Sequence, residues 1–167
     1  AGLKGLTLRA RAGPVRQILE QAMIRLPLTM RRIHPDISDT QLFGGPDIAA
    51  TLAEGRLAGD RGLAETPALL ILPMAERAAP GLAARLGAIL DRGQGHGLVL
   101  LDEGIDDDEN APAALSDRLA FHTNLNDTRW SDARMILPAP GDIDAARSLL
   151  SRVTSTATDA ATLTALA

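Results

Sequence analysis

The sequence contains no cysteine and very few aromatic residues. Among its 167 residues there is no tyrosine, and aromatic residues make up 2% of the chain, against 46% for hydrophobic residues as a whole. Without cysteine the chain can have no disulfide, no thiolate zinc site and no cysteine nucleophile. The core must therefore be built from leucine, isoleucine, valine and alanine, and the lack of thiols is compatible with a reducing compartment.

The sequence also lacks a strong excess of one charge and any long apolar run. The formal net charge is −4, and the lysine and arginine residues are dispersed. This pattern does not predict the basic, aromatic-containing surface of a nucleic-acid-binding protein. No apolar stretch approaches the roughly 20 residues that a membrane-spanning helix needs. We therefore expect no nucleic-acid partner and no membrane span.

Five short apolar runs predict β-strands, and helical segments separate them. The strands are expected at residues 6–9, 30–34, 68–72, 98–101 and 119–122. The helices are expected at residues 14–26, 46–54, 80–92 and 112–119. The third and fourth strand runs are continuous rather than alternating, which is typical of strands buried on both faces of a parallel sheet. Alternating strands and helices predict a three-layer α/β fold with a parallel five-stranded sheet.

A segment rich in proline and glycine at residues 138–141 is expected to be a hinge. Behind it Asp142 is a favourable N-cap for a further helix. We interpret residues 1–138 as an α/β core and residues 139–167 as the first part of a small helical lid subdomain. Within the core, the pair Gly44-Gly45 is interpreted as a turn.

Residues 9–16 have the layout of a phosphate-binding loop without its chemistry. A strand, a loop containing Arg11 and Gly13, and a helix follow one another, as in the pattern GxxxxGK[ST]. With Arg9 at the first glycine, Val15 stands at the lysine and Arg16 at the serine or threonine. That lysine meets the β- and γ-phosphates, and the hydroxyl holds Mg²⁺. A nucleotidase fold in this chain would have lost its own nucleotide chemistry.

A second loss follows the third predicted strand. A nucleotidase places aspartate and glutamate there to hold Mg²⁺ and activate water, but the sequence reads Pro73-Met74. Neither side chain can bind Mg²⁺ or act as a base, and Glu76 comes two residues late. The position after the third strand therefore lacks its nucleotide-binding side chains, as the phosphate loop does.

The densest charge in the chain lies directly after the fourth predicted strand. Ligands of open α/β sheets bind at such positions. One interpretation is a loop that binds a divalent metal, since hard cations prefer several carboxylates; a second is a docking surface for a partner protein. A third is a solvated loop that precedes a helix. Docking is favoured over metal binding, and its candidate residues are Asp106, Asp107, Asp108 and Glu109.

Arg118 follows a short predicted helix and precedes the last strand. An arginine at such a turn can reach across a subunit boundary toward a phosphate. An ion pair with the adjacent Asp117 is the simpler interpretation, and the local sequence alone favours it. The three histidines show no metal-ligand spacing, so we expect no metal site.

Several segments resemble the AAA+ subunits of the magnesium chelatase family. The general similarity lies in residues 34–39 and 42–52, and the more specific similarity lies in residues 72–77, 100–109 and 114–122. These last segments resemble the D subunit rather than the ATP-hydrolysing I subunit. The resemblance covers most of residues 3–125.

The resemblance implies an AAA+ fold and a role in an enzyme complex. Magnesium chelatase inserts Mg²⁺ into protoporphyrin IX in (bacterio)chlorophyll synthesis, which places the chain in the cytoplasm of a photosynthetic bacterium. D subunits assemble with I subunits into hexameric rings and connect them to the porphyrin-binding H subunit. The I subunits hydrolyse ATP, so the complex uses ATP and Mg²⁺ while this domain binds no cofactor.

Positions carried over from the family define a vestigial nucleotide site and an arginine finger. Glu103 lies near the polar sensor position after the fourth strand, and Arg118 matches the arginine that points toward the ATP of a neighbouring subunit. The vestigial site comprises Arg9, Arg11, Gly13, Val15, Arg16, Pro73, Met74 and Glu103. The resemblance therefore implies a platform subunit without ATPase activity that contributes Arg118 in trans.

Two alternatives stay open at this point. In the first, the chain binds nucleotide through an unusual loop in which Arg9, Arg11 and Arg16 replace the lysine. In the second, it is a purely structural interaction module with no role at any ATP site. The second alternative differs from the arginine-finger interpretation only in the role of Arg118.

Overall fold

The fold was analysed in a computed structural model of the chain. The structure describes residues 3–24, 26, 28–46, 51–53, 55–56, 59–106, 108–132, 141–142, 145 and 148. The chain divides into two compact units, residues 1–134 and residues 135–167. All the strands named below lie in the first unit.

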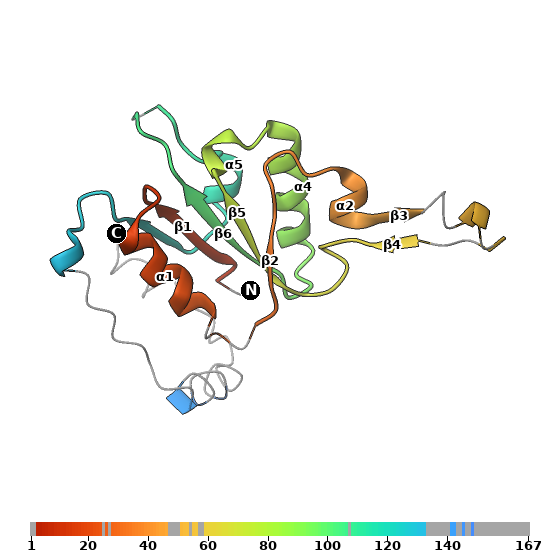
Figure 1. Cartoon of the computed structure of the whole chain (residues 1–167), viewed down its shortest axis with the longest axis horizontal. Coiled ribbons are helices and arrows are strands. Elements are labelled where there is room, and N and C mark those ends of the chain that lie inside the picture. Colours follow the sequence, from red (N-terminus) through yellow and green to blue (C-terminus); the bar gives the residue numbers. More distant parts are fainter. Residues whose placement is uncertain are drawn as a thin grey trace, which may run out of the picture. The chain divides into compact units, whose positions relative to one another are not determined.

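A five-stranded parallel sheet forms the centre of the first unit (Figure 1). Its strands, in chain order, are β1 (Gly5–Arg9), β2 (Met30–Arg32), β5 (Leu69–Pro73), β6 (Gly97–Asp102) and β7 (Phe121–Asn124). The order across the sheet is β2-β5-β6-β1-β7. Each predicted strand is present, with its ends shifted by up to two residues. Because all five strands are parallel, their carboxyl ends meet at one edge, which carries the loops after β1, β5 and β6.

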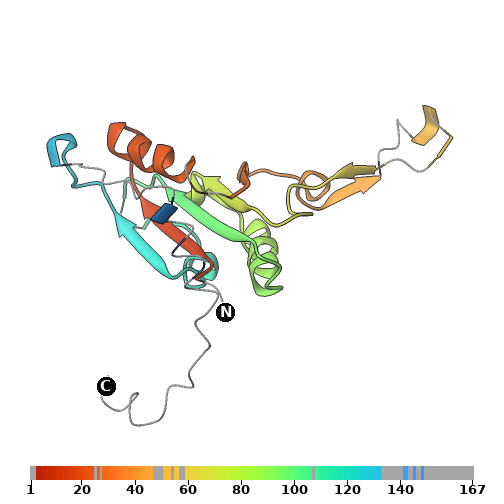
Figure 2. The ribbon, with the colours of Figure 1, turned by 90° about the horizontal axis from the view of Figure 1, so that it is seen from below.

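Helices cover both faces of this sheet, as Figure 2 shows most clearly. Helix α1 (Pro14–Ile24) lies on one face and packs through Met23 against a cluster that includes Leu8 and Leu101. On the other face are α4 (Pro80–Asp91) and the short α5 (Ala113–Ser116). Leu86 of α4 and Leu115 of α5 belong to the larger core cluster. The predicted three-layer α/β architecture is confirmed.

The central strands are buried on both faces, as their continuous apolar runs predict. In β6 the five residues after Gly97 are all buried, and in β5 only the third and fifth residues are partly accessible. Fully burying each leucine stabilises the fold by roughly 1.5–3 kcal/mol. With so few aromatic residues, this layered leucine packing supplies most of the core.

A hairpin that the sequence did not predict projects from the sheet (Figure 1). Helix α2 (Asp39–Phe43) begins at a capping box formed by Ser38 and Gln41. It leads into β3 (Gly44–Pro46), which pairs antiparallel with β4 (Gly59–Arg61). The turn expected at Gly44-Gly45 and a helix starting at residue 46 are therefore wrong.

The physical reason for the hairpin is a close approach of two backbones. Gly44 has a φ of 83°, and a Cβ atom there would lie 2.6 Å from the carbonyl oxygen of Asp60. Glycine alone fits such a position without strain. A strand that reads Gly-Gly-Pro carries no alternation of side chains, so the pattern gave no strand signal. Residues 51–53 are helical, and most of the rest of the predicted helix lies outside the described residues.

The described part of the first unit also contains two short 3₁₀ helices, η1 (Ala75–Arg77) and η2 (Trp130–Asp132). In the second unit Gly141, Asp142, Ala145 and Ser148 are helical. The apolar residues of the helix predicted there lie outside the described residues, so the lid and the boundary at residue 138 stay predictions. Across the part of the chain that the structure describes, no helix is both long and apolar enough to cross a membrane.

Candidate nucleotide site and exposed arginine

Backbone N–H groups of the loop between β1 and α1 are already hydrogen-bonded to other parts of the chain. The Ala10 N–H donates to the Asp102 carbonyl oxygen at 2.9 Å, and the Arg11 N–H donates to Asn126 Oδ1 at 3.1 Å. Pro14, at the second glycine of the phosphate-loop pattern, has no N–H to donate. A phosphate loop works by presenting free backbone N–H groups to an anion. These three positions no longer provide any.

The space beside this loop is small. A cavity of about 160 Å³ is lined by residues 10–16 together with Leu125, Asn126 and Thr128. The Leu125 N–H donates to the Arg9 carbonyl oxygen at 2.8 Å, which ties the segment after β7 to the loop. Ligand pockets usually measure about 300–1,000 Å³. The predicted site residues Arg11, Gly13, Val15 and Arg16 thus line a cavity smaller than the usual range for ligand pockets.

Arg16 is a buried cation held between two carboxylates. The residue is 6% exposed. Its Nε donates to Glu20 Oε1 at 2.8 Å, and its Nη1 lies 2.6 Å from Glu103 Oε1 as an ion pair. Burial lowers the pKa of Arg16, but the hydrogen bonds and charges of Glu103 and Glu20 outweigh this effect and raise it overall. The residue aligned with the Mg²⁺-binding hydroxyl is therefore a fixed positive charge.

The ion pairs of Arg16 extend to other elements of the core. Glu20 Oε2 also lies 3.7 Å from Arg32 Nη1 at the end of β2. The backbone N–H of Glu103 donates to Glu76 Oε2 at 2.9 Å. Glu76, which the sequence placed two residues late for a metal ligand, thus supports the segment that carries Glu103. The network connects α1, β2, η1 and the end of β6.

Pro73 and Met74 occupy the end of β5 without offering any side-chain oxygen. Pro73 is the last residue of the strand and pairs in register with Leu101. Met74 has a φ of 49° and is the N-cap residue that precedes η1. The left-handed conformation is uncommon for a residue with a branched or bulky side chain. It turns the chain so that Glu76, rather than residue 74, reaches Glu103.

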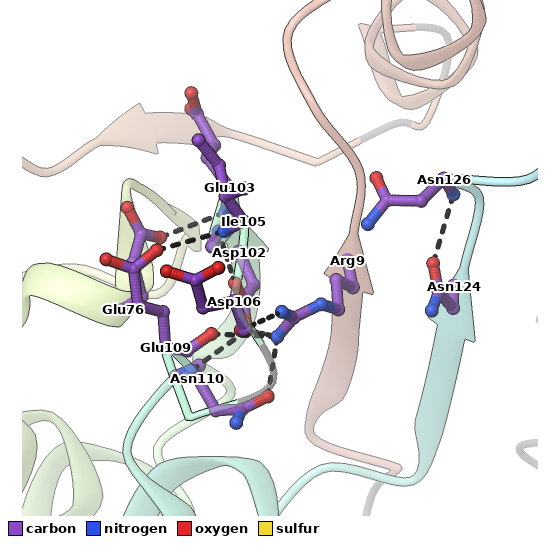
Figure 3. Close-up of polar contacts among 12 residues, drawn as sticks. Arg9, Glu76, Asp102, Glu103, Ile105, Asp106, Glu109, Asn110, Asn124 and Asn126 are labelled. Carbon is purple, nitrogen blue, oxygen red and sulfur yellow. Dashed lines mark hydrogen bonds and ion pairs between the residues drawn. The ribbon is translucent and has the colours of Figure 1, made fainter.

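Arg9 is directed away from the loop that it begins and toward the loop after β6 (Figure 3). Its Nη1 donates to the Glu109 carbonyl oxygen at 2.8 Å and to Asn110 Oδ1 at 2.5 Å. Its Nη2 donates to the Asp106 carbonyl oxygen at 2.7 Å. Arg9 therefore organises the acidic loop and is not aimed at an anion beside α1.

Asp102 is the second anchor of this loop, and it is only 3% exposed. Its Oδ1 accepts the Gly104 N–H and its Oδ2 accepts the Ala111 N–H, both at 2.9 Å. Arg9 Nη1 lies 3.4 Å from the same Oδ2. A buried carboxylate needs such partners because an isolated buried charge is very costly. The first acid of the run is thus structural.

Among the remaining acids of this loop, one makes hydrogen bonds within the loop and others are exposed to solvent. Glu109 accepts the Ile105 N–H at 3.0 Å, and this bond, with a further backbone bond from Asp106, lowers the pKa of Glu109. Asp106 and Asp108 are exposed, and Asp107 lies outside the described residues. Among the described residues no group of three or more acids or histidines could hold a metal ion.

Arg118 lies at the opposite edge of the sheet, just before β7. Its Nε and Nη2 donate to Asp91 Oδ2 at 3.1 and 3.0 Å. Its Nη1 donates to the Ala114 carbonyl oxygen. The Asp91 carboxylate raises the pKa of Arg118, and Arg118 together with Lys4 lowers the pKa of Asp91. The partner of Arg118 is thus Asp91 at the end of α4, not the adjacent Asp117.

The structure brings together some of the predicted residues and separates others. Arg16 meets Glu103, and Arg9 meets Asp106 and Glu109, whereas Arg118 lies at the other edge of the sheet from both groups. Sequence reasoning missed the partners Glu20, Asp102, Asn110, Asn126 and Asp91. Of these, only Glu20 carries a local signal, because an i,i+4 spacing from Arg16 favours an ion pair on a helix.

The sheet order and the strand–loop–helix geometry define a three-layer α/β domain with a P-loop-like fold. A solved structure of an inferred ATPase from Cytophaga hutchinsonii has the same fold, with a TM-score of 0.61 and 12% sequence identity over 93% of this chain and 56% of that one. No protein-family model matches the chain.

Two curated proteins are similar in sequence to all or nearly all of the chain. The magnesium-chelatase 60 kDa subunit of Cereibacter sphaeroides is 48% identical over the whole chain, and that of Rhodobacter capsulatus is 42% identical over 92% of it. The chain spans about 30% of the length of these relatives. The matches confirm the resemblance to the magnesium chelatase D subunit.

Proposed function

We propose that this chain is the non-hydrolysing AAA+ platform of a magnesium chelatase subunit. It assembles with the ATP-hydrolysing I subunit and assists Mg²⁺ insertion into protoporphyrin IX in the cytoplasm of a photosynthetic bacterium. The observation that carries the proposal is the buried Arg16 guanidinium, held by Glu103 and Glu20 at the position that binds Mg²⁺ in an active P-loop. The two chelatase relatives indicate the complex in which it acts.

Arg16 closes the site by electrostatics as well as by volume. Mg²⁺ at this position would face the fixed charge of Arg16, and two like charges about 4 Å apart repel each other strongly where the effective dielectric is low. Removing Arg16 from Glu103 and Glu20 would leave carboxylates without their cation, which is strongly unfavourable in a partly buried site. The chain is therefore expected to bind no nucleotide, and the I subunit supplies the bound ATP and Mg²⁺.

The same contacts argue against the two alternatives to different degrees. Binding of phosphate by three arginines is disfavoured, because Arg9 and Arg16 already use their guanidinium groups on partners within the chain. Of the three arginines, Arg11 lines the small cavity with an exposed side chain that makes no hydrogen bond or ion pair to the described residues. A purely structural module stays the competing interpretation, and it makes a different prediction only for Arg118.

The position of Arg118 supports a role at a neighbour's nucleotide rather than at its own loop. It precedes β7, whereas the phosphate loop follows the parallel strand β1, so the length of a strand separates them. The five residues of β1, at about 3.3 Å each, span roughly 16 Å, which is beyond the reach of an arginine side chain. In a hexameric ring the adjacent I subunit provides the phosphate. An arginine there stabilises transition-state charge without needing its own nucleotide site.

The exposed part of the acidic loop is the proposed docking surface for a partner subunit. Asp106, Asp108 and Glu109 are exposed, and Ile105 beside them is 69% exposed. An apolar side chain rimmed by charges is a common form of a protein-binding patch. The porphyrin-binding H subunit is expected to join through the full-length complex.

One experiment tests the proposed function directly. The full-length subunit is mixed with the I subunit, with and without ATP, and ring assembly is read by size together with the ATPase rate. The proposal predicts no ATPase activity from the full-length subunit alone, a mixed ring with ATP, and a rate that falls when Arg118 is replaced by alanine. ATP hydrolysis by the subunit alone, or failure to assemble, would contradict it.

A further inference from the structure

Gly87 sits in the interior of α4, where glycine normally weakens a helix relative to alanine. The position is buried, and what lies against it is the head of Arg118. A Cβ atom at residue 87 would lie 3.4 Å from both Cζ and Nε of Arg118, at the short limit of ordinary van der Waals contact. The missing side chain lets the guanidinium lie against the helix surface.

The same helix fixes the orientation of that guanidinium. Asp91 is four residues after Gly87 and therefore on the same face of the helix. It accepts from Nε and Nη2 of Arg118 at 3.1 and 3.0 Å. From α5, the Ala114 carbonyl oxygen accepts from Nη1. The guanidinium therefore has one face against Gly87 and two edges hydrogen-bonded to Asp91 and Ala114.

The guanidinium still has donors for an outside acceptor. Arginine carries five N–H groups in a planar fork. The contacts with Asp91 and Ala114 use three of them, which leaves one N–H on Nη1 and one on Nη2. The side chain of Arg118 is 38% exposed. A phosphate brought by a neighbouring subunit could accept these two hydrogen bonds while Asp91 stays in place.

We propose that Gly87, Asp91 and the Ala114 carbonyl form a seat that pre-orients Arg118 for the ATP of the neighbouring subunit. The inference rests on the proposed function of Arg118 and names its positioning residues. A free arginine loses rotamer freedom when it binds, and a side chain that is already oriented loses less. Small misplacements of a catalytic group have large effects on rate, so the seat acts on kcat.

The test uses the full-length subunit mixed with the I subunit, and it measures kcat and KM for ATP together with the Tm of the subunit. Arg118→Ala should lower kcat about tenfold or more. Asp91→Asn and Gly87→Ala should each lower kcat by about three- to tenfold and leave KM for ATP unchanged. Asp91→Glu should restore part of the loss, because it keeps a carboxylate on the same helical turn.

Two readouts separate positioning from a structural role. Gly87→Ala should leave the Tm unchanged or raise it, because alanine is the better helix former. If Gly87 and Asp91 had only a structural role, kcat would fall only in variants whose Tm also falls. The seat predicts that kcat falls while the Tm does not. The matched control is Asp39→Asn. It removes the 3.0 Å ion pair between Asp39 of α2 and Arg85 of α4 and does not alter the contacts of Arg118. It should leave kcat unchanged.

Each failure has a distinct meaning. If Arg118→Ala leaves kcat unchanged, the arginine finger is wrong and the seat falls with it. If Arg118→Ala lowers kcat but Gly87→Ala and Asp91→Asn do not, the finger stands and the seat is wrong. If Asp91→Asn raises kcat, Asp91 restrains Arg118 instead of orienting it, which also overturns the proposal.

Discussion

The two edges of the sheet use arginine in opposite ways. At the carboxyl edge, Arg16 is 6% exposed and shared between Glu20 and Glu103, and Arg9 is bound by the acidic loop. At the amino edge, Arg118 rests on Asp91 with 38% of its side chain exposed and donors to spare. We propose that the buried arginine, with its two carboxylates, closes a nucleotide site, and that the supported and exposed arginine serves the site of a neighbour.

The largest effect on stability is expected at the closed edge. Arg16→Ala should lower the free energy of unfolding by about 2–4 kcal/mol, because it leaves Glu103 and Glu20 near each other without their cation. The value lies below that of a fully buried pair because both carboxylates are about a quarter exposed. Urea unfolding followed by circular dichroism measures the change.

The matched control for Arg16 is Arg11→Ala in the same loop. Arg11 is exposed, so its removal should change the free energy of unfolding by less than about 0.5 kcal/mol. Equal effects of the two substitutions would show that the network around Arg16 contributes nothing, and the contrast between the two edges would be lost.

Asp102→Ala should have the next largest effect, about 2 kcal/mol. It removes the acceptor for the Gly104 and Ala111 N–H groups, and an unsatisfied buried donor costs about 1–3 kcal/mol. The substitution should also loosen the acidic loop and weaken binding to the I subunit if that loop is the docking surface. Size-exclusion chromatography of the mixed complex and urea unfolding check the two parts separately.

At the exposed edge, Asp91→Asn should leave the Tm nearly unchanged. Its carboxylate is about half exposed, and surface ion pairs contribute little to stability because solvent and salt screen them. A differential scanning calorimetry trace that moves as far as that of Arg16→Ala would mean that the Arg118 pair is structural.

The smallest expected effect is a pH dependence from His96, which also lies at the amino edge of the sheet. Burial lowers the pKa of His96 below 6.5, the nearby charge of Arg31 lowers it further, and backbone hydrogen bonding at Ala68 and Ala64 partly opposes the shift. The unfolded chain therefore takes up the proton first as the pH falls. Stability should be constant above about pH 6.5 and decline below it until the folded pKa is passed.

Replacing His96 with asparagine should remove this part of the pH dependence. Tm values measured from pH 8 to pH 5 in matched buffers compare the two proteins. If the two profiles are parallel over that range, His96 does not titrate differently in the folded and unfolded chains.

The fold was predictable because its strongest signals are local. The continuous runs that became β5 and β6, and the apolar stripe of α1, identify a layered α/β domain without any long-range information. The β3–β4 hairpin was not predictable. Its glycines allow close backbone contact between residues that pair 13 to 17 positions apart, and such contacts leave no periodic pattern.

The sequence could show which nucleotide-binding side chains are missing from the site. It could not show which contacts the residues at those positions make instead. The alignment with a phosphate loop shows that Val15 and Arg16 lack the required chemistry. It does not show that Arg16 forms an ion pair with Glu103, 87 positions along the chain. Nor does it show that Arg118 forms an ion pair with Asp91 at the end of α4. Those pairings depend on the order of strands and the packing of helices, which the structure supplies.

The central claim is that the chain's own nucleotide site is closed by Arg16. Isothermal titration calorimetry of the full-length subunit with Mg-ATP tests it most directly, with the Arg16→Ala variant measured alongside. The account predicts no binding tighter than about 0.1 mM, which corresponds to about 5.5 kcal/mol. Tighter binding by the unmodified subunit would contradict the account, and its loss on replacing Arg16 would show that Arg16 holds the phosphates instead of excluding them.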